Sequence, residues 1–309
     1  MGSEPRTESS EPPSGRPLRS PASLPDARLI PRLSGSEAQA YLRQLVLPEL
    51  PVVFTDVMHR VPAMSKWTPA FFKGLYGQLP VEVAGRTVTL SEQLRLIEGS
   101  TEECPAPYPY SFSITDRAPE LMADLAPFVS FGRSDRTVHP LMPRTLLNGT
   151  VVHELFFGGR GAGFPTLHYD LLGMSTQITQ IAGDKEFFLF DPSHTPLLYP
   201  TAISPRTSAI NNIFAPDLER FPLFRQACPT RVLLREGETL YFPAGWWHLT
   251  RIHGPSITYG RAVVNASNWR LMMRENLGRW RGSRPLMAVP GYLFGTAVGL
   301  LFNMMEAVG

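Results

Sequence analysis

The feature that most constrains the fold of this chain is a His-x-Asp pair, His168 and Asp170, followed much later by His248. Residues two apart in an extended strand project to the same face, so His168 and Asp170 can bind one ion while Tyr169 points away. His248 ends the apolar run 239–248, which we expect to be a strand that begins after a turn at Gly237. The fold must therefore bring two distant extended segments to one point.

Two imidazoles and one carboxylate are the protein ligands of the 2-His-1-carboxylate iron site, which leaves coordination positions open for a co-substrate and O₂. We therefore predict that His168, Asp170 and His248 bind Fe(II) and are the catalytic residues of an oxygenase. The alternative is a metal-free structural β-barrel in which these histidines are incidental.

The segments around the pair predict an all-β core. Residues 175–181 have the pattern of a strand, residues 182–184 that of a tight turn around Gly183, and residues 185–190 that of a second, apolar strand. The pair and the third ligand should thus lie on separate strands of one β domain.

These motifs, in this order, resemble the Jumonji-C domain of the cupin-like type, among the iron(II)- and 2-oxoglutarate-dependent oxygenases. The matching segments are residues 164–170, 183–185, 237–248 and 264–269, within a likeness that covers roughly residues 30 to 270. The resemblance implies a mainly β fold, a double-stranded β-helix (jelly-roll or cupin) with flanking α-helices and the metal at its open mouth. It also implies Fe(II), 2-oxoglutarate and O₂ as cofactor and co-substrates.

Three further residues match positions that bind 2-oxoglutarate in the family. Lys185 matches the lysine that pairs with the distal carboxylate, Tyr110 a tyrosine that helps to hold it, and Asn265 an asparagine that lines the pocket. Each has a structural alternative: Lys185 flanks an exposed turn, Tyr110 packs in a strand, and Asn265 ends a strand in a turn. If Lys185 does not pair with the co-substrate, Arg261 is the replacement.

The chain departs from the family pattern at two positions. Many relatives have Thr or Ser where this chain has Pro165, and some have Asn where it has Ile178. Thr166 and Thr176 are the neighbouring residues that could supply the missing hydrogen bonds to 2-oxoglutarate.

Length and composition fit one domain with tails. The chain has 309 residues, 43% of them hydrophobic, and a net charge of +2, which gives no strong nucleic-acid signal. Cys104 and Cys228 are far apart, which argues against a disulfide framework or a zinc site and favours a reducing, intracellular and cytoplasmic location. We divide the chain into a disordered tail (1–27), a helix-rich lead-in with the first strands (28–144), the Jumonji-C core (145–270) and an apolar helical segment (271–309).

Local signals predict the elements of the lead-in. Thr68 followed by Pro69 marks a helix start, and Ser91 is expected to cap a helix that ends at Gly99. The other predicted elements are a helix at 36–47 and strands at 51–54, 81–83 and 87–89.

The C-terminal segment has two interpretations. Residues 285–305 contain no charged residue, and Gly291, Gly295 and Gly299 would lie along one face of a helix. The segment either packs within the protein or in a homodimer, or it anchors the chain in a membrane, with the preceding arginines on the cytoplasmic side. We expect packing or dimerisation.

The function predicted from these observations is hydroxylation of a protein or peptide side chain, with release of succinate and CO₂. The alternatives are N-methyl demethylation, hydroxylation of a tRNA base or a small molecule by the same chemistry, and a cupin-like binding module without turnover.

Overall fold

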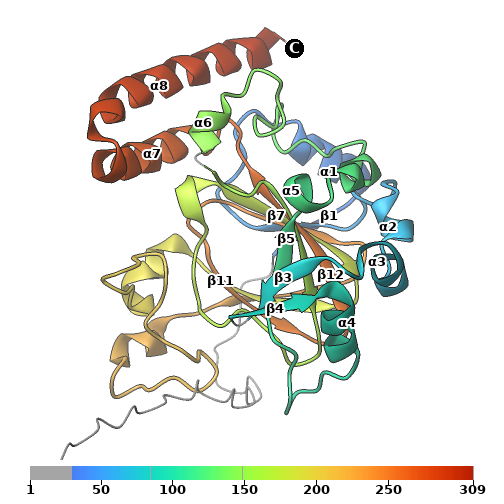
Figure 1. Cartoon of the computed structure of the whole chain (residues 1–309). Coiled ribbons are helices and arrows are strands. Elements are labelled where there is room, and N and C mark those ends of the chain that lie inside the picture. Colours follow the sequence, from blue (N-terminus) through green and yellow to red (C-terminus); the bar gives the residue numbers. More distant parts are fainter. Residues whose placement is uncertain (1–29, 84, 148, 309) are drawn as a thin grey trace, which may run out of the picture.

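The computed structural model describes residues 30–83, 85–147 and 149–308, so the predicted tail at 1–27 lies outside the described residues. Figure 1 shows a β domain with helices at its periphery. The strands are β1 (Arg32–Leu33), β2 (Val52–Phe54), β3 (Pro80–Val83), β4 (Arg86–Thr89), β5 (Tyr110–Ser113), β6 (His153–Gly158), β7 (Ser175–Ala182), β8 (Lys185–Phe190), β9 (Thr230–Leu234), β10 (Thr239–Phe242), β11 (Trp247–Ile252) and β12 (Ser256–Val263). The helices are α1 (Gly35–Leu42), α2 (Ala63–Lys66), α3 (Pro69–Tyr76), α4 (Leu90–Glu98), α5 (Ile114–Arg117), α6 (Arg144–Leu147), α7 (Trp269–Ser283) and α8 (Pro285–Val308), with 3₁₀ turns η1 (Pro119–Leu125), η2 (Leu171–Gly173), η3 (Pro192–Leu198) and η4 (Pro222–Gln226).

Two main sheets enclose the interior. The larger has the order β1-β2-β10-β7-β12-β6-β5 and the smaller the order β11-β8-β9, while β3 and β4 form a separate hairpin. Within the two main sheets the neighbours are antiparallel except β1 and β2. Side chains from both sheets line one cavity. The arrangement is the mainly β, double-stranded β-helix fold that the resemblance implied.

The strand β8 has the predicted bounds and β7 ends one residue later than predicted, at Ala182, but the two strands do not pair with each other. β7 lies between β10 and β12 in the large sheet, whereas β8 lies between β11 and β9 in the small one. Gly183 at the junction has a positive φ of 71°, and a Cβ there would lie 2.2 Å from the carbonyl oxygen of Pro255. The glycine therefore lets the chain pass from one sheet to the other beside a close backbone neighbour.

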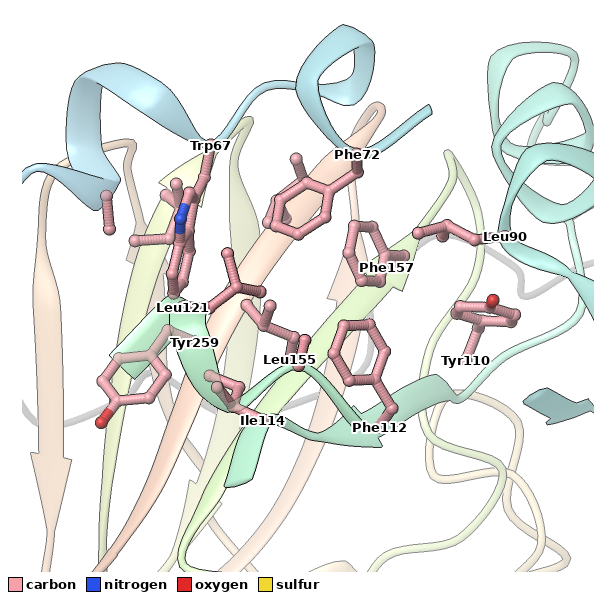
Figure 2. Close-up of a cluster of buried hydrophobic side chains, with 14 of the residues drawn as sticks. Trp67, Phe72, Leu90, Tyr110, Phe112, Ile114, Leu121, Leu155, Phe157 and Tyr259 are labelled. Carbon is pink, nitrogen blue, oxygen red and sulfur yellow. The ribbon is translucent and has the colours of Figure 1, made fainter. Parts of the chain in front are cut away.

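The lead-in covers the outer face of the large sheet. Figure 2 shows Trp67 and Phe72 packed toward Phe157 of β6 and Tyr259 of β12, and all four side chains are almost fully buried. Burial of such aromatic side chains contributes roughly 1.5–3 kcal/mol each. This cluster holds β6 and β12, and therefore one wall of the cavity, in place.

The predicted helix starts are partly confirmed. The Thr68 hydroxyl accepts a hydrogen bond from the Phe71 amide, as expected of an N-cap. α4, however, is capped by Thr89 in a capping box with Glu92, so the prediction of Ser91 was wrong by two residues. α1 also ends earlier than predicted, at Leu42.

Candidate active site

The three predicted ligands meet in a cavity of about 360 Å³ between the two sheets. Its lining includes His168, Asp170, His248 and Lys185. A larger cavity of about 780 Å³ lies elsewhere, between α1 and the end of α8, and contains none of these residues. The chemistry of the side chains therefore assigns the site to the smaller cavity.

The backbone brings the ligands together through one antiparallel bridge. The His248 amide donates to the His168 carbonyl at 2.7 Å, and the His168 amide donates back at 3.2 Å. The ligand atoms of His168, Asp170 and His248 all lie within 4.8 Å of one another. His248 is the second residue of β11, after a turn that contains Gly245, so the prediction that it ends the preceding strand was wrong. His168 lies in an isolated bridge and Asp170 at the start of η2.

The hydrogen bonds of both imidazoles fix the tautomer that a metal requires. His168 Nδ1 lies 2.9 Å from the Thr166 carbonyl oxygen, and His248 Nδ1 lies 3.2 Å from that of Trp246. Because a carbonyl oxygen only accepts, both Nδ1 atoms carry a proton, so that each ring in its neutral form presents the Nε2 lone pair to a metal. Burial lowers the pKa of His248 to about 4, which keeps this ring neutral near pH 7.

Asp170 is held as a carboxylate. Desolvation alone would raise its pKa, but the two neighbouring histidines and a hydrogen bond from the Thr176 hydroxyl outweigh this and lower it. Thr176 thus orients one carboxylate oxygen of Asp170. Two neutral imidazole nitrogens and one carboxylate form a donor set that fits Fe(II).

Lys185 is a buried cation in the same cavity. Its side chain is 2% exposed, and its Nζ donates to the Tyr108 hydroxyl at 2.8 Å. Burial lowers the pKa of Lys185 to about 7, although the nearby Glu154 carboxylate opposes this. Within 30–83, 85–147 and 149–308, no carboxylate lies within ion-pair distance of Nζ. A ligand carboxylate would supply the missing counter-charge, so the site fits 2-oxoglutarate.

Comparison with known proteins agrees with this geometry. Residues 80–265, more than half of the chain, match the cupin-like domain family. This chain belongs to that family. Its Jumonji-C character, predicted from the motifs, is confirmed by relatives of that type.

The named cupin-like relatives cover different shares of the chain. Human HSPB1-associated protein 1 is 35% identical over 128 residues, which is 40% of this chain and 25% of that protein. Lysine-specific demethylase 8 of Xenopus tropicalis is 24% identical over 236 residues, 72% of this chain and 50% of that protein. The human bifunctional peptidase and (3S)-lysyl hydroxylase JMJD7 is 24% identical over 250 residues, 67% of this chain and 75% of that protein. The chain thus spans only a quarter of the length of the HSPB1-associated protein.

Among the residues proposed for the cupin-like co-substrate pocket, Lys185 and Thr176 line the cavity, whereas Tyr110, Asn265 and Thr166 do not. Tyr110 is fully buried among Phe112, Phe157 and Leu90 in the cluster of Figure 2, and its hydroxyl has no hydrogen-bond partner among the described residues. The structure therefore places Tyr110 in the outer core, as in the packing alternative.

The Asn265 side chain forms hydrogen bonds with neighbouring backbone groups, and Thr166 takes part through its own backbone carbonyl. The Asn265 amide donates to the Phe131 carbonyl, and its oxygen accepts from the Ser267 amide, so the side chain stabilises the turn before α7. Thr166 contributes its carbonyl oxygen to His168. Arg261, the suggested replacement for Lys185, pairs with Asp135 at 2.5 Å and donates to the Val129 carbonyl.

Sequence reasoning missed three residues of the site, namely Tyr108, Glu154 and Arg206. Tyr108 lies two residues before Tyr110 in the same Tyr-Pro-Tyr motif, so the motif was found but the wrong tyrosine was chosen. Glu154 lines the cavity from β6 and accepts from the Ser111 hydroxyl at 2.6 Å, and burial raises its pKa. Arg206 also lines the cavity, from the segment between η3 and η4. Neither Glu154 nor Arg206 belongs to a recognisable motif.

Proposed function

We propose that this protein is an iron(II)- and 2-oxoglutarate-dependent dioxygenase that hydroxylates a protein or peptide side chain. The observation that carries the proposal is the combination, in one cavity, of three convergent candidate metal ligands with a buried lysine that has no carboxylate within 4 Å among the described residues. In a barrel without a ligand, this lysine would only destabilise the fold, because burying an ammonium without a paired carboxylate costs free energy.

Each side chain has a defined task in this proposal. His168, Asp170 and His248 hold the iron through their free lone pairs, and Lys185 holds the distal carboxylate of 2-oxoglutarate. When bound, iron and 2-oxoglutarate supply an O₂-dependent oxidation of a substrate C–H bond, coupled to decarboxylation to succinate and CO₂.

Residues around these side chains orient them and exclude water. The Tyr108 hydroxyl oxygen accepts a hydrogen bond from the Lys185 ammonium and so directs it. The rings of Phe156 and Phe187 lie within 5.6 Å of Lys185 Nζ and form an apolar wall around it. In such a dry site an ion pair is stronger than in water.

A protein substrate is supported by the names of two relatives, one a lysyl hydroxylase and the other a lysine demethylase. Hydroxylation is our first choice because it is the direct product of the oxidation, whereas demethylation requires a further loss of formaldehyde. A tRNA base or a small molecule would be oxidised by the same residues. A reducing intracellular compartment suits the enzyme, since it keeps iron ferrous.

The test of the reaction is succinate release from 2-oxoglutarate with ferrous iron and O₂. Wild type should release succinate, while His168→Ala, Asp170→Ala and His248→Ala should lose turnover and bound iron with little change in Tm. His59→Ala, an exposed histidine outside the cavity, is the matched control and should keep full activity. Full activity in any of the three ligand variants would refute the metal assignment.

The test of the substrate is incubation with cell extract followed by mass spectrometry. Addition of one oxygen atom to a protein side chain, dependent on iron and 2-oxoglutarate, supports the proposal. Formaldehyde release without a stable oxygen addition would instead assign demethylation, and oxygen addition confined to RNA or small molecules would exclude a protein substrate.

A further inference from the structure

The C-terminal helices α7 and α8 form a hairpin along one edge of the domain (Figure 1). Its inner face is made by the glycines noted in the sequence. A Cβ at Gly295 would lie 2.1 Å from Met273 Sδ, and one at Gly299 would lie 2.2 Å from Trp269 Nε1. The glycine face is therefore occupied by α7 of the same chain.

The far end of α8 is tied to the domain by a buried ion pair. Arg136, which is fully buried, donates to both carboxylate oxygens of Glu306 at 2.8 and 2.7 Å and to Asn303 at 2.6 Å. α8 has 24 residues and is long and apolar enough to cross a membrane. To span a bilayer, α8 would have to leave α7 and break the Arg136–Glu306 pair. The buried Arg136 guanidinium would then have lost its carboxylate partner.

The outer face of α8 is apolar and exposed. Its large side chains with the greatest exposure are Leu286, Met287, Val289, Leu293, Phe294, Leu300, Leu301, Met304 and Val308. Leu286, at the hairpin tip, is 90% exposed. A continuous apolar surface of this kind indicates an interaction site.

The same hairpin is strongly basic. Its exposed charged residues are arginines only: Arg270, Arg274, Arg279, Arg281 and Arg284. Among the described residues, none of the five forms an ion pair within 4 Å. The two acidic residues of the hairpin offset little of this charge, because Glu306 is paired with Arg136, and Glu275 is half-buried against η2, where it attracts Arg279. At the tip, Arg281 and Arg284 directly precede the exposed Leu286 and Met287.

We propose that the α7–α8 hairpin is a peripheral docking surface for an anionic membrane, with α8 lying in the interface plane while it stays packed on α7. Apolar side chains enter the acyl boundary and the arginines contact acidic headgroups, the two terms that together bind an amphipathic helix to a bilayer. A second copy of this chain is a poorer partner, because in a symmetric contact the hairpin would face the same hairpin, whose exposed charged residues are all arginines and offer no acidic partner.

The test is co-sedimentation of the full-length protein with vesicles of phosphatidylcholine alone or with phosphatidylserine. We expect binding only to the anionic vesicles and its loss in high salt, because salt screens exposed charges. The double variant Arg281→Gln/Arg284→Gln should bind about thirtyfold more weakly, since each basic residue near an anionic surface contributes about 1 kcal/mol. Leu286→Ser should also weaken binding, whereas Arg86→Gln and Leu75→Ser, which are exposed elsewhere, should not.

Three results would overturn the proposal. Equal binding to neutral vesicles, or none to anionic ones, would remove the charge argument. A dimer in sedimentation equilibrium that Phe294→Ser dissociates, without vesicle binding, would assign the face to a second copy. Binding that resists high salt would indicate a spanning helix instead.

Discussion

Replacing Lys185 with Met tests the cavity most directly, because it should impair catalysis and stabilise the fold at once. The substitution keeps an unbranched apolar stem and removes the ammonium. In the proposed enzyme, Lys185 forms a buried charge pair with 2-oxoglutarate. The loss of this pair should weaken the binding of 2-oxoglutarate by about 2–5 kcal/mol. The KM for 2-oxoglutarate should then rise roughly thirty- to several-thousandfold, with iron still bound.

The effect on stability has the opposite sign. Burial lowers the pKa of Lys185 from 10.5 to about 7, so the folded protein carries the charge at a cost of up to about 5 kcal/mol. This cost is present in full below pH 7. It falls as the pH rises from 7 toward 10.5, the pKa of the lysine in the unfolded chain. The variant should therefore have a higher Tm than wild type at pH 6, and the difference should shrink at pH 9.

The assay combines succinate release over a range of 2-oxoglutarate concentrations with thermal unfolding at both pH values. Lys73→Met, an exposed lysine of α3, is the matched control and should change neither quantity. An unchanged KM together with a lower Tm would mean that Lys185 has only a structural role, and it would refute the reasoning.

Three further predictions follow from particular contacts. The wild-type KM for 2-oxoglutarate should rise by up to tenfold per pH unit above about pH 7, as Lys185 loses its proton; a flat profile from pH 6 to 9 would contradict this. Tyr108→Phe removes the hydroxyl that directs Lys185 and should raise the KM about fivefold, whereas Tyr110→Phe, in the outer core, should leave it unchanged; the reverse result would restore Tyr110 to the site. Gly299→Ala places a Cβ against the Trp269 indole and should lower the Tm, while Gly278→Ala on α7 meets open space and should raise it slightly; equal effects would show that the α7–α8 packing is loose.

The sequence by itself identified the candidate metal ligands and most of the local elements. His168, Asp170 and His248 could be named because a metal site requires particular residue types, and the two-residue spacing of the first pair fits an extended chain. The bounds of β8, those of β7 to within one residue, and the Thr68 cap also follow from patterns within a few residues, which depend on local geometry.

Only the tertiary structure decided which neighbours these residues meet. Tyr108 rather than Tyr110 reaches Lys185, because pairing of β5 with β6 turns Tyr110 to the outer face of the large sheet. Likewise, β8 joins a different sheet from β7, and the glycine face of α8 is occupied by α7. Such outcomes depend on strand register and on contacts between residues far apart in the chain, about which local spacing carries no information.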